Sequence, residues 1–223
     1  MFKYKTAVFC AIVSIFAMCL SGCSFYTFNP TVSSIFIKKN YTIVSAEIET
    51  LDNSAYEEER YSVDSLKAFV EDEVKQYNKK ACGLELAYLD DLQDKKNSTL
   101  PVSIQEIKYE DNTARLLLMY QDASAYLGFN DHPLDGGITN IMVGRVSDLI
   151  KKKIEFPEMT DTDQNVAEYN ELEINSNYFV VTITGSAHVH VEGEIEYVSP
   201  GVTVTQKHEA DTPADTESFI IFR

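Results

Sequence analysis

The sequence predicts an α+β protein with a mostly antiparallel sheet, one long amphipathic helix, one or two shorter helices and a β-rich C-terminal third. Helical and strand-like stretches are grouped along the chain and do not alternate strictly, which is typical of the α+β class. One stretch near residue 70 repeats its apolar residues with a helical period, whereas the last third alternates apolar and polar residues between turn residues. These observations fix the class before any single element is considered.

Residues 63–79 are the strongest predicted helix. Ser62 is a suitable N-cap, and Gly83 follows the last turn, where glycine commonly ends a helix. Apolar residues three and four positions apart should form one face of this helix against the core. That stripe comprises Leu66, Phe69, Val70, Val74 and Tyr77.

Strands are expected on both sides of this helix and throughout the last third of the chain. Glycine, proline and short polar runs separate them, as turns between antiparallel strands require. The expected hairpins pair 33–37 with 41–51 and 102–109 with 113–120; further strands are expected at 84–92, 178–184, 187–197, 202–205 and 217–222. Short helices are expected at 122–129 and 142–152, and a polar loop at 157–170.

Composition excludes several classes of protein. The chain has 223 residues, of which 44% are hydrophobic, and a net charge of −16. Such an acidic chain does not favour nucleic-acid binding, because affinity for phosphate comes from clustered lysine and arginine. Four cysteines are too few for a disulfide scaffold.

The N-terminus has the organisation of a secretory signal. Lys3 and Lys5 precede an uncharged apolar run over residues 7–20. At 14 residues this run is shorter than the ~20 needed to cross a bilayer, and its length and flanks suit a signal peptide.

The run ends in Leu20-Ser21-Gly22-Cys23, which resembles the lipobox of bacterial lipoproteins. The resemblance implies cleavage after Gly22 and diacylglyceryl modification of Cys23, and two acyl chains anchor a protein stably. We therefore expect a signal peptide over 1–22, a lipidated tether over 23–30 and a single α+β domain over 31–223. The expected location is the extracytoplasmic face of the cell membrane; an ordinary secretory signal with a chance cysteine is the alternative.

The body of the chain is similar to uncharacterised lipoproteins of clostridia-like Firmicutes. The similarity implies location and a single-domain architecture, and it implies no activity. It rests on residues 34–40, 125–130, 189–202 and 219–222.

His188, His190 and Glu192 form the main candidate metal site. In a strand these side chains share one face, and two imidazoles with a carboxylate can ligate Zn²⁺ or another transition metal. Glu194 and Glu196 continue the same alternation. The competing interpretation is a half-buried strand whose polar face meets water.

Two other candidates are weaker. Residues 161–165 begin like a calcium loop, but Val166 and Leu172 stand where an EF-hand needs glycine and glutamate. Cys82, the single cysteine left beyond Cys23, is expected to be a small buried apolar residue.

The sequence thus favours a lipid-anchored, non-catalytic binding or assembly module whose partner is an unidentified envelope protein or ligand. No cofactor is expected beyond the candidate zinc or other transition-metal ion. The alternative is a metal-assisted envelope enzyme using His188 and His190. Common motifs of hydrolases, nucleotide-binding and redox enzymes are absent, and a two-lobed solute-binding protein would need a longer chain of alternating strands and helices.

Overall fold

A computed structural model of the chain describes residues 28–50, 63–93, 99–110, 112–131, 137–168, 172–173 and 175–223. The expected signal peptide, Cys23 and the first part of the tether lie outside this range, as does the expected N-cap at Ser62. In the described part of the chain, no helix is both long and apolar enough to cross a membrane.

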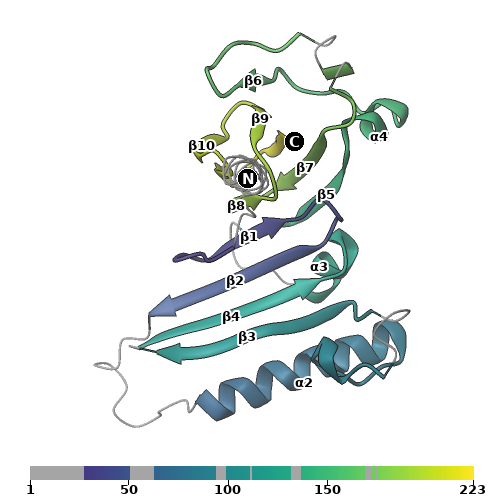
Figure 1. Cartoon of the computed structure of the whole chain (residues 1–223), viewed down its shortest axis with the longest axis vertical. Helices are drawn as coiled ribbons and strands as arrows, with labels where there is room; N and C mark the ends of the chain where they lie inside the picture. The colour runs from purple at the N-terminus through teal and green to yellow at the C-terminus, as the bar shows by residue number, and fades with distance from the viewer. Residues whose placement is uncertain are drawn as a thin grey trace, which may run out of the picture.

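The described residues form two sheets with one long helix and two short helices beside them, which confirms the α+β class (Figure 1). We call the seven-stranded sheet, with strand order β10-β11-β8-β1-β2-β4-β3, sheet A. Neighbouring strands in it are antiparallel except β1 and β8, which are parallel. Its strands are β1 (Ser34–Ile37), β2 (Ile43–Thr50), β3 (Val102–Glu110), β4 (Thr113–Tyr120), β8 (Ala187–Val191), β10 (Thr203–Gln206) and β11 (Glu209–Thr212).

The second sheet, sheet B, is antiparallel and has the order β5-β7-β12-β9-β6. Its strands are β5 (Asn140–Arg145), β6 (Thr160–Asp161), β7 (Phe179–Thr184), β9 (Ile195–Val198) and β12 (Glu217–Phe222). The helices are α2 (Val63–Cys82), α3 (Ala123–Phe129) and α4 (Val146–Lys151), with a 3-10 turn at Leu89–Asp91.

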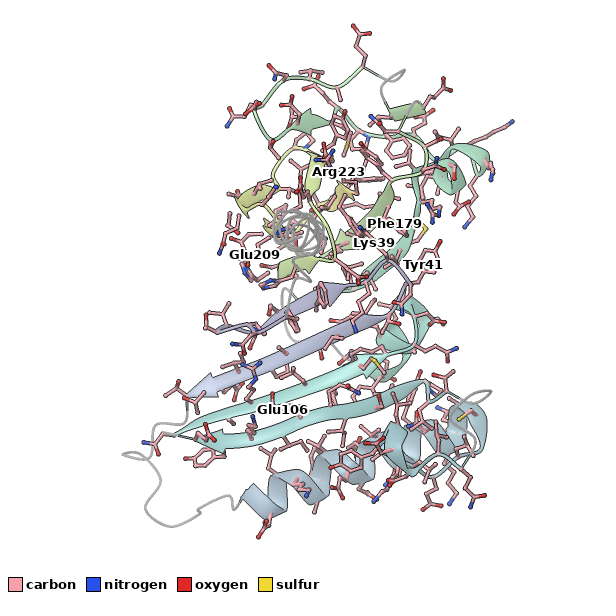
Figure 2. The ribbon with its side chains drawn as sticks, in the orientation of Figure 1. Lys39, Tyr41, Glu106, Phe179, Glu209 and Arg223 are labelled. Atoms are coloured by element: carbon pink, nitrogen blue, oxygen red, sulfur yellow. The ribbon has the colours of Figure 1, made fainter. Side chains whose placement is uncertain are left out.

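One apolar cluster joins the two sheets. It contains Ile37 and Val189 from sheet A together with Val181 and Phe222 from sheet B, all of them buried. Tyr41, in the turn between β1 and β2, reaches Phe179 of β7 with 6.3 Å between ring centroids (Figure 2). The one cysteine among the described residues, Cys82, is free, so packing and not a disulfide joins the two sheets there.

The predicted helix is confirmed, and it protects the free edge of sheet A. Asn78 is fully buried; its amide nitrogen donates to the carbonyls of Leu86 and Val102, and its oxygen accepts the N–H of Val102. An exposed strand edge invites pairing with other chains, so this side chain closes the edge at the start of β3. Asn78 occupies the edge groups of Val102, and residues 84–92 bond to β3 through the carbonyl of Ala87, which accepts the N–H of Ile104 at 2.9 Å, without forming the expected strand.

The stripe predicted on α2 is only half right. Val70 and Val74 are buried and Tyr77 is partly buried, but Leu66 and Phe69 are 38% and 64% exposed. Local periodicity marks the apolar face of a helix, but how far a sheet extends beneath that face depends on distant segments.

Two other predicted elements are divided. Residues 142–152 are not one helix, because the chain runs as β5 up to Arg145 and becomes α4 at Val146. Residues 187–197 are two strands in different sheets, separated at Gly193. A Cβ added at Gly193 would lie 1.8 Å from the carbonyl oxygen of Arg223, so only glycine fits where the chain crosses between the sheets. The four-residue strand β11 was not predicted.

Candidate functional site

The face of sheet A that points away from the shared core carries the candidate site. We call it the outer face. Alternation along the strands brings His190, Phe36, Val44 and Met119 into register across β8, β1, β2 and β4. The helix α2 packs on the opposite, inner face with Ile104 and Leu118, and so does not cover the outer face.

The last residues of the expected tether lie on this face. Phe28 stacks on Phe36 with ring centroids 5.1 Å apart, and its ring meets that of His190 edge-on at the same distance. Arg115 of β4 donates from Nη1 to the carbonyl of Pro30 at 2.8 Å and from Nη2 to Oδ1 of Asn29 at 3.1 Å. The chain therefore enters the domain along the outer face.

A groove of about 340 Å³ runs beside this segment. Its lining combines apolar side chains with polar and charged ones. The lining residues are Phe28, Phe36, Lys38, Val44, Gln105, Leu117, Met119 and Glu192.

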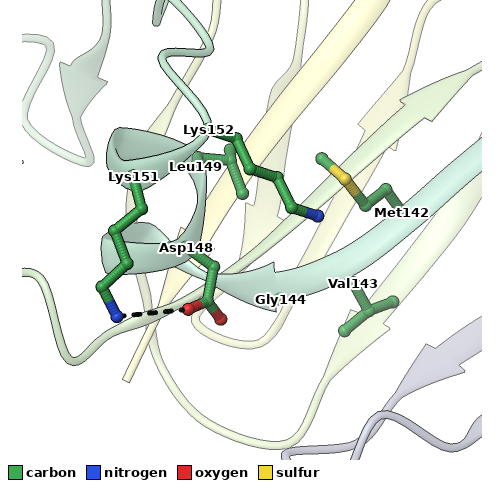
Figure 3. Close-up of a pocket in the computed structure, with 7 residues that line it drawn as sticks. All are labelled: Met142, Val143, Gly144, Asp148, Leu149, Lys151 and Lys152. Atoms are coloured by element: carbon green, nitrogen blue, oxygen red, sulfur yellow. Dashed lines mark ion pairs between the residues drawn. The ribbon is translucent and has the colours of Figure 1, made fainter.

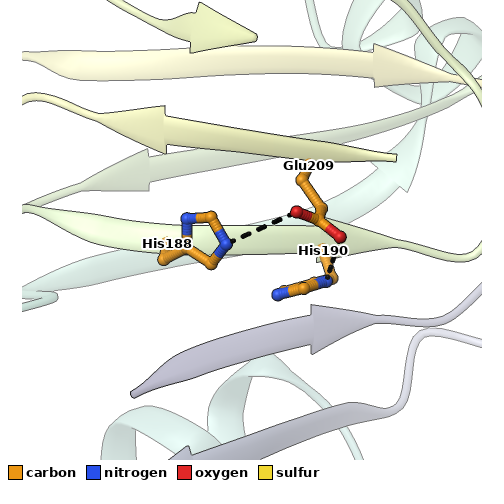
Figure 4. Close-up of side chains that lie close together, drawn as sticks. All are labelled: His188, His190 and Glu209. Atoms are coloured by element: carbon orange, nitrogen blue, oxygen red, sulfur yellow. Dashed lines mark ion pairs between the residues drawn. The ribbon is translucent and has the colours of Figure 1, made fainter. Parts of the chain in front are cut away.

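The two predicted histidines come together with a third residue that the sequence did not indicate (Figure 4). The ligand atoms of His188, His190 and Glu209 all lie within 4.8 Å of one another. Glu209 is on β11, directly opposite His190 on β8, with 3.4 Å between His190 Nδ1 and the carboxylate. His188 Nε2 lies 3.7 Å from the other carboxylate oxygen.

Two neighbouring side chains hold this cluster in place. Asp211, opposite His188 on β11, accepts a hydrogen bond from His188 Nδ1 at 2.6 Å. Gln206 of β10 donates from Nε2 to the Glu209 carboxylate at 2.8 Å. The cluster thus combines two imidazoles and a carboxylate, each with a defined orientation.

Burial differs within the cluster. The side chain of His190 is 6% exposed, that of Glu209 14% and that of His188 22%. Burial lowers the pKa of His190 below its usual value, because the charged imidazolium loses hydration; the nearby Glu209 carboxylate opposes this shift. A neutral imidazole is the form that ligates metals.

The other acidic residues of the predicted face do not join the cluster. Glu192 follows the end of β8, and its carboxylate accepts the backbone N–H of Lys39 at 2.7 Å. Glu194 pairs with Lys207 and Arg223, while Glu196 pairs with Arg223. The break at Gly193 carries both of these glutamates away from the histidines and towards sheet B.

A second pocket, of about 230 Å³, lies between β5 and α4 (Figure 3). Its charged side chains are Asp148, Lys151 and Lys152; Lys151 is paired with Asp148 at 3.8 Å, and both lysines are exposed. Such solvated groups form a weaker candidate site than the histidine cluster.

The remaining sequence candidates are accounted for. Asp161 accepts hydrogen bonds from the backbone N–H groups of Asp163 and Asn165 and from the Asn165 amide, so its carboxylate closes its own turn. Cys82 is exposed at the end of α2, and the expectation that it is buried was wrong.

Comparisons with protein-family models, with curated proteins and with solved structures found no significant match. The function is therefore argued from the residues themselves.

Proposed function

We propose that this chain is a lipid-anchored extracytoplasmic protein. It acts as a non-catalytic binding or assembly module on the extracytoplasmic side of the cytoplasmic membrane. The anchor is Cys23, in the lipobox-like sequence Leu20-Ser21-Gly22-Cys23. The binding surface is the outer face of sheet A. The partner is an envelope protein or ligand.

The observation that carries this proposal is the path of residues 28–30. Because Arg115 and Phe36 hold this segment against sheet A, only the four residues 24–27 separate the anchoring cysteine from Phe28, the first fixed point on the domain. The five residue steps from Cys23 to Phe28 span at most about 18 Å when fully extended. An anchor at Cys23 would therefore keep the outer face close to the bilayer.

Acylation is the first test. Cells producing the full chain should incorporate labelled palmitate into it, and Cys23→Ala should abolish both the label and membrane association. Cys82→Ala is the matched control, because Cys82 is an exposed thiol outside the lipobox. Label that survives Cys23→Ala, or a Cys23→Ala protein that remains equally bilayer-associated, would refute the anchor.

The alternative is a metal-assisted envelope enzyme using His188 and His190. The observation that favours it is the clustering of three protein donors, since catalytic zinc sites use three and leave a position for water or substrate. This alternative requires hydrolysis of a substrate that depends on the bound metal and stops when the metal is chelated. A metal-loaded protein that turns over no ester, amide or phosphoester probe would count against it.

A further inference from the structure

We infer that His188, His190 and Glu209 bind one divalent transition-metal ion, represented by Zn²⁺. The ligand atoms are Nε2 of His188, Nδ1 of His190 and a carboxylate oxygen of Glu209. This inference names a ligand for the proposed binding module. It rests only on described residues and does not depend on the anchor at Cys23.

The distances suit a metal of this size. Zinc lies about 2.0–2.2 Å from nitrogen and oxygen ligands in a tetrahedron, which places neighbouring ligand atoms about 3.4 Å apart. Oε1 of Glu209 lies 3.4 Å from His190 Nδ1, and its Oε2 lies 3.7 Å from His188 Nε2. With one ligand atom taken from each residue, the three atoms lie within 4.8 Å of one another. Small side-chain rotations would bring all three donors to bonding distance without a change in strand register.

The surroundings of the cluster are those of a ligand set. Metal-bound histidines usually donate their second N–H to a carboxylate, which fixes the tautomer and the ring orientation. Asp211 does this for His188, and the resulting tautomer leaves Nε2 with a lone pair on the side of Glu209. Gln206 orients Glu209, and Phe28 packs against the edge of the His190 ring.

Charge also favours a cation. Asp211 and Glu209 place two carboxylates around two imidazoles on adjacent strands, and Glu209 is mostly buried. A divalent ion bound between them would compensate this negative charge. Nitrogen donors select zinc and its transition-metal neighbours, whereas Mg²⁺ and Ca²⁺ prefer sites built only of oxygen.

The competing explanation is that the histidines simply pair with the two carboxylates. Titration of the metal-stripped, tag-free full chain in detergent with Zn²⁺, followed by calorimetry, separates the two explanations. We expect one Zn²⁺ per chain with a Kd in the micromolar range or tighter, and no comparable binding of Mg²⁺. A chain that binds no Zn²⁺ at micromolar concentrations would overturn the inference.

Variants locate the site. His188→Ala and Glu209→Gln should each weaken Zn²⁺ binding by more than about 100-fold, and Asp211→Asn by about 10–100-fold, the range for a residue that supports a ligand. Glu192→Gln is the matched control, because the Glu192 carboxylate accepts the backbone N–H of Lys39 and does not join the cluster. This variant should bind Zn²⁺ with unchanged affinity.

Equal affinities of Glu209→Gln and Glu192→Gln would overturn the assignment. Glu209→Gln is nearly isosteric, so circular dichroism should show a native fold, and the Co²⁺ absorption spectrum of the unmutated chain reports nitrogen ligation without any substitution. Cys23→Ala should bind Zn²⁺ as the unmutated chain does, so loss of the anchor and loss of the metal site are read separately.

Discussion

Replacing Gly193 with alanine is the most informative test of how the two sheets are joined. An added Cβ would lie 1.8 Å from the carbonyl oxygen of Arg223, whereas carbon and oxygen ordinarily approach no closer than about 3.3 Å. The last residue must therefore move by about 1.5 Å. That movement separates Arg223 from Glu194, with which it exchanges two backbone hydrogen bonds of 3.0 and 3.2 Å.

The cost follows from these contacts. Two lost hydrogen bonds destabilise by about 1–3 kcal/mol together. Crowding in a well-packed region adds about 1–3 kcal/mol. We expect a loss near 4 kcal/mol, the middle of the summed range, which at about 2–4 °C per kcal/mol for a chain of this size lowers Tm by about 8–16 °C.

Urea unfolding and a thermal scan measure this loss. Gly144→Ala is the matched control: Gly144 also lies near the end of a strand, in β5, but a Cβ added there would have Leu149 as its nearest neighbour at an ordinary 3.8 Å. Removal of Arg223 should relieve most of the penalty at Gly193. If Gly193→Ala and Gly144→Ala differed by less than about 0.5 kcal/mol, within the usual effect of surface substitutions, the described crossing would be wrong.

Three further outcomes are expected. Lys207 and Arg223 lower the pKa of the Glu194 carboxyl to about 2. Its ionised form therefore stabilises the fold above about pH 4.5, and this stabilisation is lost as the pH falls towards 2. An NMR titration of Glu194 with a midpoint near 4.5 would contradict this. Asn78→Ala should cost about 3 kcal/mol in urea unfolding, because it leaves buried backbone groups unpaired, and a loss below 1 kcal/mol would argue against the edge contact. Arg115→Ala should speed hydrogen exchange at the start of the domain without lowering Tm by more than a few degrees, and unchanged exchange would mean that this arginine does not hold the tether.

Local patterns predicted the elements whose partners are close in sequence. The β1–β2 and β3–β4 hairpins, α2 and α3 follow from turn residues, alternation and caps within a few positions. Asp122, for example, accepts the N–H of Ala125 and begins α3 where the sequence expects it.

What depends on distant pairing could not be predicted. Glu209 belongs to the histidine cluster only because β11 pairs with β8 in the register that places it opposite His190. Alternation along one strand suggested Glu192 instead. The glycine at 193 was visible in the sequence, but the need for glycine there comes from the contact with Arg223, which is distant in sequence.

The measurement that tests the central claim most directly is the depth of the outer face relative to the bilayer. The acylated full chain in vesicles would carry an environment-sensitive fluorophore at Gln105, in the groove of the outer face, or at Glu73, on the exposed side of α2. The proposed arrangement requires lipid-attached quenchers to quench the probe at Gln105 strongly and the probe at Glu73 weakly. Equal quenching, or stronger quenching at Glu73, would contradict the proposal that the outer face of sheet A lies beside the membrane.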